Sequence, residues 1–167
     1  RTGAHGFKKR VALKRILPEL ASDPEFLAMF IDEARVTATL AHPNVVQVFD
    51  FGEDRGELFM AMELVVGTTA AQLIRAAIAA SLRIPLGVVV HVVTSVLRGL
   101  AHAHDAIDAH GRPLRLVHRD VSPSNVLIDA SGAVKLTDFG IARAAPIERR
   151  TDVGQLKGKL GYMSPEQ

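Results

Sequence analysis

The sequence has no cysteine among its 167 residues. This absence excludes disulfide bonds and thiolate zinc sites, and it agrees with a reducing cytosol. Aromatic residues are scarce, at 5%, and no face of lysine and arginine is interleaved with them. Because the net charge is only +2, the chain does not have the character of a nucleic-acid-binding protein, despite its basic isoelectric point.

Long apolar runs are missing as well. The most apolar stretches are interrupted by Arg75, Arg83, His91 and Arg98, and none reaches the roughly 18–20 apolar residues of a membrane-spanning helix. No signal peptide, internal repeat or low-complexity tract is visible. The sequence does have a 48% share of hydrophobic residues, which is typical of one globular domain with a core of its own.

The first predicted helix has clear signals at its N-terminus. Asp23 is a predicted N-cap, Pro24 occupies the first helical position, and the helical pattern continues to about Ala41. One glutamate shares a stripe with apolar side chains, where it needs a cation as its partner. This stripe consists of Phe26, Phe30, Glu33, Thr37 and Leu40.

Three strands are predicted around this helix. Residues 9–17 form the first, and the period of two puts Ala12 and Lys14 on one face. Residues 45–51 and 57–64 form the next two, joined by a polar turn with a glycine at each end. This half of the chain therefore predicts a small sheet with one helix.

A break at Gly67 introduces the second half, and we place a lobe boundary near residue 66. Residues 69–80 predict a short helix and residues 85–104 a long one, followed by a loop over residues 105–115. On the long helix we expect Val89, Val93, Val96 and Leu100 to face inward, and His91, Ser95, Arg98 and His102 to face outward.

A second hairpin is predicted near the end of the chain. Its strands, residues 126–129 and 134–137, flank the turn Ala130-Ser131-Gly132. The sum of paired residue numbers stays nearly constant in an antiparallel pair, so Asn125 and Asp138 emerge at the same open end. Two oxygen ligands there suit Mg²⁺, which completes its octahedron with phosphate and water oxygens.

Four short motifs follow one another in a fixed order. They are His118-Arg119-Asp120, Asn125, Asp138-Phe139-Gly140 and Ser164-Pro165-Glu166. Each alone would occur by chance, but their order and spacing together are typical of phosphoryl transfer from ATP. From Val11 to Gln167 the chain resembles a protein kinase, and in detail the eukaryotic-like Ser/Thr kinases of bacteria.

The resemblance implies a role for each catalytic position. Asp120 would accept the proton of the substrate hydroxyl, while Asn125 and Asp138 would hold Mg²⁺. Lys14 would bind the α- and β-phosphates of ATP, with Glu33 as its ion-pair partner. A helix that swings this glutamate in or out would act as a switch.

The same resemblance implies an adenine site. Met62 would gate the back of the pocket, and the backbone from Glu63 to Val65 would bind the adenine. Ala12 and Leu127 would cover the two faces of the ring. Ordinary core packing would explain these side chains equally well.

Three further positions are interpreted through the resemblance. His118 would pack against Phe139, and Arg119 would pair with a phosphate on the activation segment. Thr151 follows two arginines and is a candidate autophosphorylation site, although an ordinary solvated loop threonine is equally compatible with the sequence.

The chain departs from the family pattern in three ways. The Gly-rich phosphate loop is missing and the sequence stops at Gln167, so we expect a fragment that also lacks the distal helices of the large lobe. Ser122 replaces the usual catalytic-loop lysine, and Lys159 replaces a usual threonine of the closing segment. We predict that Lys159 supplies the missing charge to the transferred phosphate, the alternative being that it points into solvent.

The predicted architecture is an α+β, two-lobed protein-kinase-like fold, truncated at both ends. Residues 1–65 would form a partial N-terminal lobe, and residues 66–167 a partial C-terminal lobe. We expect the isolated fragment to be inactive, because the parts that cover the phosphates and support the catalytic loop are missing.

The function implied for the parent enzyme is transfer of the ATP γ-phosphate to Ser/Thr hydroxyls of proteins. Its cofactors would be ATP and Mg²⁺, and its partners protein substrates rather than nucleic acid. We expect a cytoplasmic kinase domain, with membrane attachment of the parent left open. Two alternatives remain: a pseudokinase that acts as a scaffold, and a small-molecule phosphotransferase of related fold.

Overall fold

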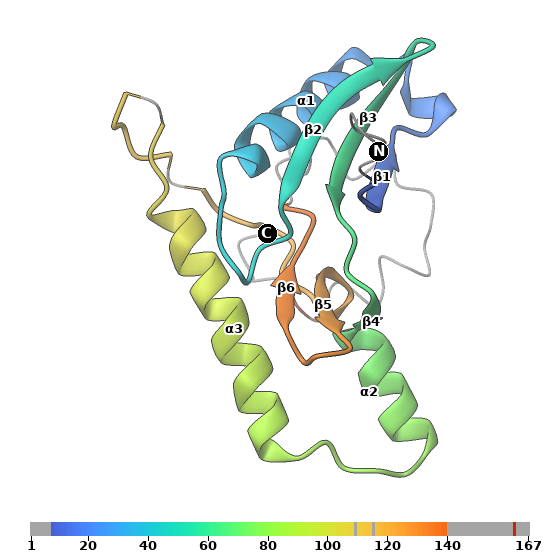
Figure 1. Ribbon diagram of the computed structural model, residues 1–167, viewed down its shortest axis with the longest axis vertical. Coiled ribbons are helices and arrows are strands. Elements are labelled where there is room, and N and C mark those ends of the chain that lie inside the picture. Colours follow the sequence, from blue (N-terminus) through green and yellow to red (C-terminus); the bar gives the residue numbers. More distant parts are fainter. Residues whose placement is uncertain (1–7, 109, 115, 140–161, 163–167) are drawn as a thin grey trace.

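The computed structural model describes residues 8–108, 110–114, 116–139 and 162, and its strands form two three-stranded sheets (Figure 1). The strands are β1 (Val11–Arg15), β2 (Val48–Asp54), β3 (Glu57–Glu63), β4 (Gly67–Thr69), β5 (Val126–Asp129) and β6 (Val134–Leu136). The first sheet has the order β1-β3-β2 and the second the order β4-β5-β6, with antiparallel neighbours in both. Together with three α-helices, these sheets give the predicted α+β class.

Helix α1 (Pro24–Ala38) begins where the sequence predicts. The carboxylate of Asp23 accepts hydrogen bonds from the backbone N–H groups of Glu25 and Phe26, which have no partners within the helix. The helix ends slightly earlier than predicted, because Thr39 turns its N–H and its hydroxyl back onto the last turn.

The buried face of α1 packs on the first sheet. Phe30 is buried, and its ring centroid lies 5.8 Å from that of Phe51 on β2. Glu33 and Thr37 follow on the same face and are also buried, which confirms the central part of the predicted stripe, whereas Leu40 lies beyond the end of the helix. The core cluster of this region consists of Ile16, Phe30, Ala34, Val48 and Met60.

The β2–β3 hairpin is longer than predicted. Strand β2 runs on to its last residue, Asp54, so the turn shrinks to Arg55 and Gly56, both with positive φ. A two-residue turn of this kind matches the twist of the paired strands, and glycine adopts such backbone angles without strain.

The segment before β2 links the two sheets instead of extending the strand from residue 45. The N–H of Val46 donates to the carbonyl of Leu136 at 2.9 Å, and the N–H of Leu136 donates to the carbonyl of Asn44 at 2.9 Å. The side chain of Asn44 adds a hydrogen bond to the carbonyl of Val134 at 2.9 Å. The hydrogen-bonding groups of residues 44–46 are used in contacts with β6, so regular pairing with β3 begins only at Val48.

Strand β4 is not among the predicted elements. It pairs with β5 so closely that a Cβ at Gly67 would collide with the carbonyl oxygen of Ile128, which explains the glycine that the sequence shows as a break. Thr69 then caps helix α2 (Ala70–Ala79) by a reciprocal pair of hydrogen bonds with Gln72.

Helix α3 (Leu86–His104) packs on β6 with a face of small residues. A Cβ at Gly99 would lie 2.8 Å from a carbonyl oxygen of the segment that links the sheets, so the close approach requires a small residue there. The predicted faces of this helix are therefore partly wrong. Ser95 is buried instead of exposed, whereas Val89 and Val93 are 43% and 50% exposed instead of buried.

The second hydrophobic core draws on both halves of the chain. Leu40 follows α1 and Phe139 follows β6, yet both are buried in one cluster. The cluster consists of Leu40, Val45, Ala70, Ala103, Val126, Val134, Leu136 and Phe139. The chain directly after α1 is therefore anchored to the second sheet.

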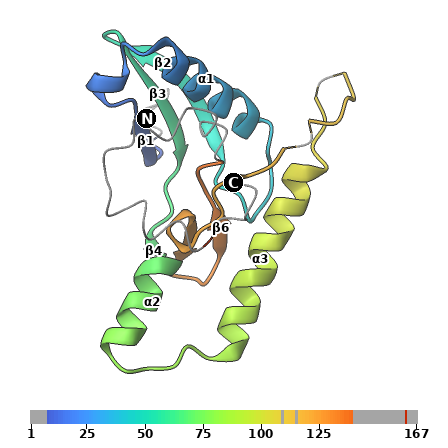
Figure 2. The ribbon, with the colours of Figure 1, turned by 180° about the vertical axis from the view of Figure 1, so that it is seen from behind.

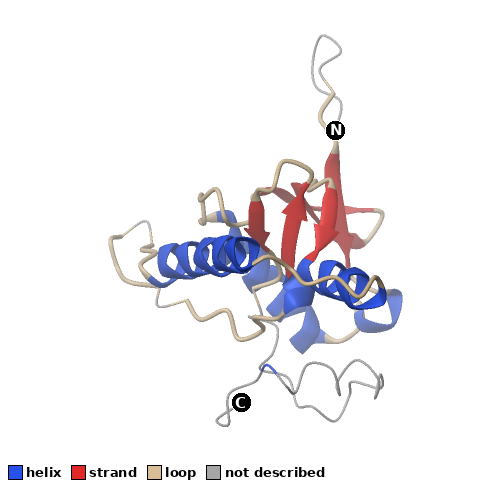
Figure 3. Cartoon of the chain, turned by 90° about the horizontal axis from the view of Figure 1, so that it is seen from below, coloured by secondary structure: helices blue, strands red, loops and turns tan. Residues whose placement is uncertain are grey.

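Helices α2 and α3 lie side by side and project beyond the second sheet, in both opposite views of the chain (Figures 1 and 2). Seen from the end at which they project, the strands lie together on one side of the helices (Figure 3). The helices thus form one end of the molecule and the first sheet the other.

Helix α3 is long and apolar enough to cross a membrane by length and composition, which contradicts the prediction drawn from its polar interruptions. The reason is that its many valines and leucines outweigh His91 and Arg98, giving a mean hydropathy of 1.5. Core helices of soluble proteins meet the same criterion, so this property alone is weak evidence for membrane insertion.

Candidate active site

Lys14 lies between two carboxylates. Its Nζ is 2.7 Å from Oε1 of Glu33 on α1 and 2.8 Å from Oδ1 of Asp138, which follows β6. The cation that the buried stripe of α1 requires is therefore supplied by β1. Because Asp138 follows the last strand of the second sheet, this contact also joins the two halves of the chain.

The charges at this site shift one another's pKa values. Burial lowers the pKa of Lys14, but Asp138 and Glu33 together outweigh it, so that the pKa lies above its usual value of 10.5. Burial raises the pKa of Glu33 above its usual value of 4.5, and the ammonium of Lys14 opposes this rise. Lys14 therefore carries its charge at neutral pH.

His118 organises the loop that carries Asp120. Its Nδ1 accepts the backbone N–H of Asp120 at 3.2 Å, so its Nε2 carries the proton and donates to the carbonyl of Thr137 at 3.1 Å. The ring centroid lies 4.5 Å from that of Phe139, and both side chains are buried. Burial lowers the pKa of His118, which favours the neutral ring that these hydrogen bonds require.

Two residues of the loop region have left-handed backbone conformations. Arg119, directly before Asp120, has φ 59°, and Asp138 has φ 55°. Non-glycine residues adopt this region at a cost, and it persists where the surrounding structure fixes it, most often at functional sites. Residues 116 and 117, directly before His118, form no strand, so the loop is held by its hydrogen bonds and packing.

The β5–β6 hairpin has the predicted register and brings Asn125 next to the residues before Asp138. The N–H of Thr137 donates to the carbonyl of Asn125 at 3.0 Å. The side chain of Asn125 is buried and its Nδ2 donates to the carbonyl of Asp120 at 2.9 Å, which identifies Oδ1 as the acceptor atom of the amide.

Asn125 and Asp138 carry the kinds of donor atom that a magnesium ion takes. An amide oxygen and a carboxylate are hard oxygen ligands, and Mg²⁺ commonly takes only one or two such groups from a protein when phosphates supply the others. Within the described part of the chain, no cluster of three or more His, Asp and Glu residues offers another metal site.

The residues predicted to bind adenine come from both sheets. Ala12 is opposite Met62 in the β1–β3 pair, and both are partly buried. Glu63 ends β3, Val65 lies in the connection to β4, and Leu127 is on β5. Their positions on either side of the connection suit the predicted roles, which stay predictions.

Two buried hydroxyl groups have no hydrogen-bond partner among the described residues: those of Thr37 and Ser122. Thr37 borders a cavity of about 10 Å³ that Glu33 and Asp138 also line, and this volume is close to that of one water molecule. Ser122, at the position of the missing catalytic-loop lysine, borders the apolar hollow between α2 and α3.

Several predicted site residues lie outside the described residues. They are Lys159, Thr151, Gly140 and the segment Ser164-Pro165-Glu166. Their predicted roles stay predictions.

With this geometry in place, comparison with known proteins is decisive. A sequence profile described as the protein kinase domain matches residues 4–167. The chain belongs to the protein kinase family. The motif order that suggested the resemblance is thus the order of this family, and the kinase has bacterial relatives over nearly its whole sequence.

Three curated relatives of this kinase illustrate the similarity. It is 44% identical to the tyrosine-protein kinase MasK of Myxococcus xanthus over 165 residues, covering 99% of this chain and 26% of MasK. It is 39% identical to the serine/threonine-protein kinase PknA of Mycobacterium tuberculosis over 170 residues, covering 95% and 35% of the two chains. It is 35% identical to the serine/threonine-protein kinase PrkC of Bacillus subtilis over 159 residues, covering 95% and 23%.

A solved structure supports the same fold. The PknI kinase domain of Mycobacterium tuberculosis superposes on this kinase with a TM-score of 0.64 at 38% identity. The match covers 82% of this chain and 52% of that one. The chain thus spans about half the length of that kinase domain, and about a quarter to a third of the length of the curated relatives.

One feature of the centre is not among the predicted site residues in its own right. Lys135 on β6 forms an ion pair with the side chain of Glu63, which the sequence singles out only for its backbone. The alternation of β6 gives no signal for this contact, since a lysine on a short strand is ordinarily a surface residue.

Proposed function

We propose that the whole protein transfers the γ-phosphate of ATP to the hydroxyl groups of protein serine and threonine residues. The observation that carries this proposal is the position of Lys14, whose ammonium contacts both Glu33 and Asp138. A complete constellation of this kind favours an active kinase over a pseudokinase, which commonly has lost one of its members.

The chain's own residues divide the work. The ammonium of Lys14 would bind phosphate oxygens, while Oδ1 of Asn125 and the carboxylate of Asp138 would hold the metal. Mg²⁺ would supply charge neutralisation on the phosphates when bound. The carboxylate of Asp120 would orient the acceptor hydroxyl and take its proton, and His118 holds the backbone of that residue in place.

The choice of serine and threonine rests on two supports. PknA and PrkC carry the name serine/threonine-protein kinase, and the ending Tyr162-Met163-Ser164-Pro165-Glu166 is similar to that type. MasK, whose printed name is tyrosine-protein kinase, is also 44% identical. Because of this relative, the acceptor residue needs a direct measurement.

The test uses the whole protein with γ-labelled ATP, Mg²⁺ and a general protein substrate, with Asp138→Asn as the inactive control. Phosphoamino-acid analysis should find phosphoserine and phosphothreonine. Phosphotyrosine alone would contradict the predicted acceptor. ATP binding without any transfer would favour the pseudokinase, and label found only on small-molecule acceptors would favour the related phosphotransferases.

We also propose functions for two residues outside the described part of the chain, and a cellular location for the kinase domain. Thr151 is an autophosphorylation site whose phosphate pairs with Arg119, and mass spectrometry of the active protein should find it modified. Lys159 places its charge on the transferred phosphate, so that Lys159→Ala should lower kcat by about 10²-fold, as for other lost transition-state donors. The kinase domain works in the cytoplasm, where fractionation should recover it.

A further inference from the structure

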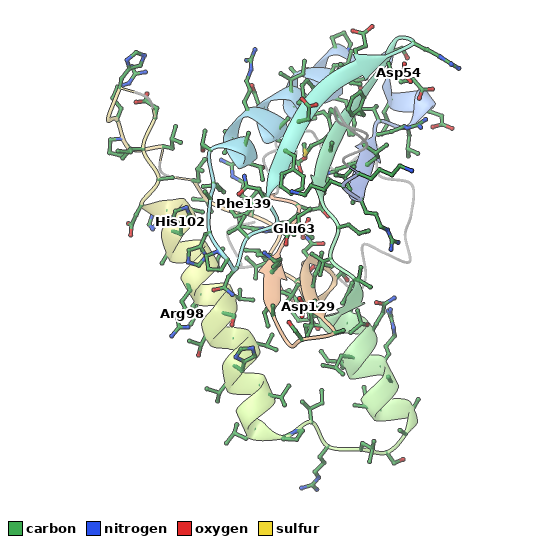
Figure 4. The ribbon with its side chains drawn as sticks, viewed as in Figure 1. Asp54, Glu63, Arg98, His102, Asp129 and Phe139 are labelled. Atoms are coloured by element: carbon green, nitrogen blue, oxygen red, sulfur yellow. The ribbon has the colours of Figure 1, made fainter. Side chains whose placement is uncertain are left out.

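A second ion pair joins the two halves of the molecule, away from the phosphate site. Nζ of Lys135 on β6 lies 3.0 Å from Oε2 of Glu63, the last residue of β3. The two side chains are only 15% and 29% exposed. Glu63 and Phe139 both lie at the centre of the molecule, between the first sheet and the second (Figure 4).

Glu63 is held at three points. Its carboxylate accepts from Lys135 and, at 3.4 Å, from the backbone N–H of Gln47. Its own backbone N–H donates to the carbonyl of Gln47 at 2.8 Å. Both the side chain and the backbone of this residue are therefore fixed relative to the segment that links the sheets.

That linking segment is itself fixed to β6. Hydrogen bonds join Val46 to Leu136 and Leu136 to Asn44, each at 2.9 Å. The ion pair closes a ring of contacts that runs from β6 through residues 44–47 to Glu63 and back to Lys135. The ring immobilises the end of β3 at the place where the chain passes from the first sheet to the second.

Another ion pair in the same chain shows what an ordinary surface contact looks like. Arg15 and Glu57 lie 3.1 Å apart within the first sheet, and their side chains are 62% and 54% exposed. A surface pair of this kind contributes little, because water competes for both charges. The Lys135–Glu63 pair differs in being mostly buried and in bridging two sheets, so loss of one partner leaves a partly buried charge behind.

We propose that Lys135 is a positioning residue for adenine recognition. Through its ion pair it fixes Glu63, and with it the backbone of residues 63–65 that receives the adenine ring. This inference rests on the proposed function, since it takes that backbone to be the adenine site. It assigns to a side chain of β6 a role in nucleotide affinity that is separate from phosphate binding by Lys14.

The experiment measures binding by calorimetry in the whole protein for three probes: Mg²⁺·ATP, adenosine and inorganic tripolyphosphate. The variants are Lys135→Met, Glu63→Gln and both together. Each single change should weaken ATP and adenosine binding by about threefold to tenfold, the range for a lost hydrogen bond to a charged group. Tripolyphosphate binding should stay unchanged, and the double variant should be no weaker than the worse single one, because the two residues act as one unit.

Arg15→Met and Glu57→Gln are the matched controls and should alter none of the three affinities. Equal losses for adenosine and tripolyphosphate would show general destabilisation and overturn the inference. Unchanged or tighter ATP binding in Lys135→Met would overturn it as well. A wild-type protein that binds neither ATP nor adenosine would overturn the proposed function itself, which distinguishes the two failures.

Discussion

The centre of the molecule and the face formed by α2 and α3 differ in how their side chains are partnered. At the centre, Lys14 meets Glu33 and Asp138, and Lys135 meets Glu63, each across elements that are distant in the sequence. On the helical face, valines and leucines border an apolar hollow of about 420 Å³. Among the residues that line it are Leu73, Ile74, Val88, Val93, Leu97 and Tyr162.

The centre of the molecule carries the groups proposed for catalysis, whereas the face of α2 and α3 carries apolar side chains that affect stability. At the centre, Lys14, Glu33 and Asp138 form one set of ion pairs at hydrogen-bond distance, and Lys135 and Glu63 form another. The described residues do not cover the apolar side chains of α2 and α3, and an exposed apolar surface of this extent is typical of one that another surface covers. Substitutions at the centre should therefore lower activity, whereas substitutions on the face of α2 and α3 should lower stability.

The largest effect is expected from Lys14→Met in the whole protein. It removes the phosphate-binding ammonium and leaves the buried carboxylate of Glu33 without its cation. Transfer of label from ATP should fall below detection, a loss of about a thousandfold or more. Arg15→Met, at the next position on the exposed side of β1, is the control and should retain activity; near-normal turnover in Lys14→Met would contradict the proposed site.

Asp120→Asn should lower kcat by about 10²–10⁴-fold, since general-base assistance acts mainly in the transition state. The nucleotide dissociation constant should stay unchanged, because the proposed role of Asp120 is toward the acceptor hydroxyl and not toward the nucleotide. Steady-state kinetics combined with calorimetry checks both halves of the prediction. Retained turnover would mean that another group takes the proton.

The helical face offers a matched pair of valines on α3. Val93 is 50% exposed and borders the hollow, whereas Val90 is 54% exposed and does not. If the hollow is covered in the whole protein, Val93→Lys should lower the free energy of unfolding by about 1–3 kcal/mol, and Val90→Lys by less than about 0.5 kcal/mol. Equal, small effects in denaturant titrations would show that the hollow is open to water.

The smallest effect concerns pH and His118. Its pKa in the folded protein lies below the ordinary value of 6.5, so the unfolded chain takes up the proton first as the pH falls. Stability from this group is therefore full above pH 6.5 and is lost below it, at no more than about 1.4 kcal/mol per pH unit. Thermal unfolding from pH 5 to pH 8 should show a shallower acid slope in His118→Phe than in the wild type.

Local signals in the sequence predicted much of the fold. The Asp23 cap, the buried stripe of α1 and the register of the β5–β6 hairpin all follow from short-range rules, since caps, periodicity and antiparallel pairing depend on near neighbours. The misses arise where distant segments override those rules. Residues 44–46 pair with β6 instead of extending β2, and α3 turns Ser95 inward because β6 packs against small residues.

The sequence by itself determined the family, because the motifs from His118 to Glu166 occur in an order and spacing that chance does not produce. It also determined which residues carry charge and metal-binding oxygen. Only the tertiary structure decided which charges meet: Lys14 with two carboxylates, and Lys135 with Glu63. The physical reason is that an ion pair depends on a separation of a few ångströms in space, and residues far apart in the chain reach that distance only when the sheets pack.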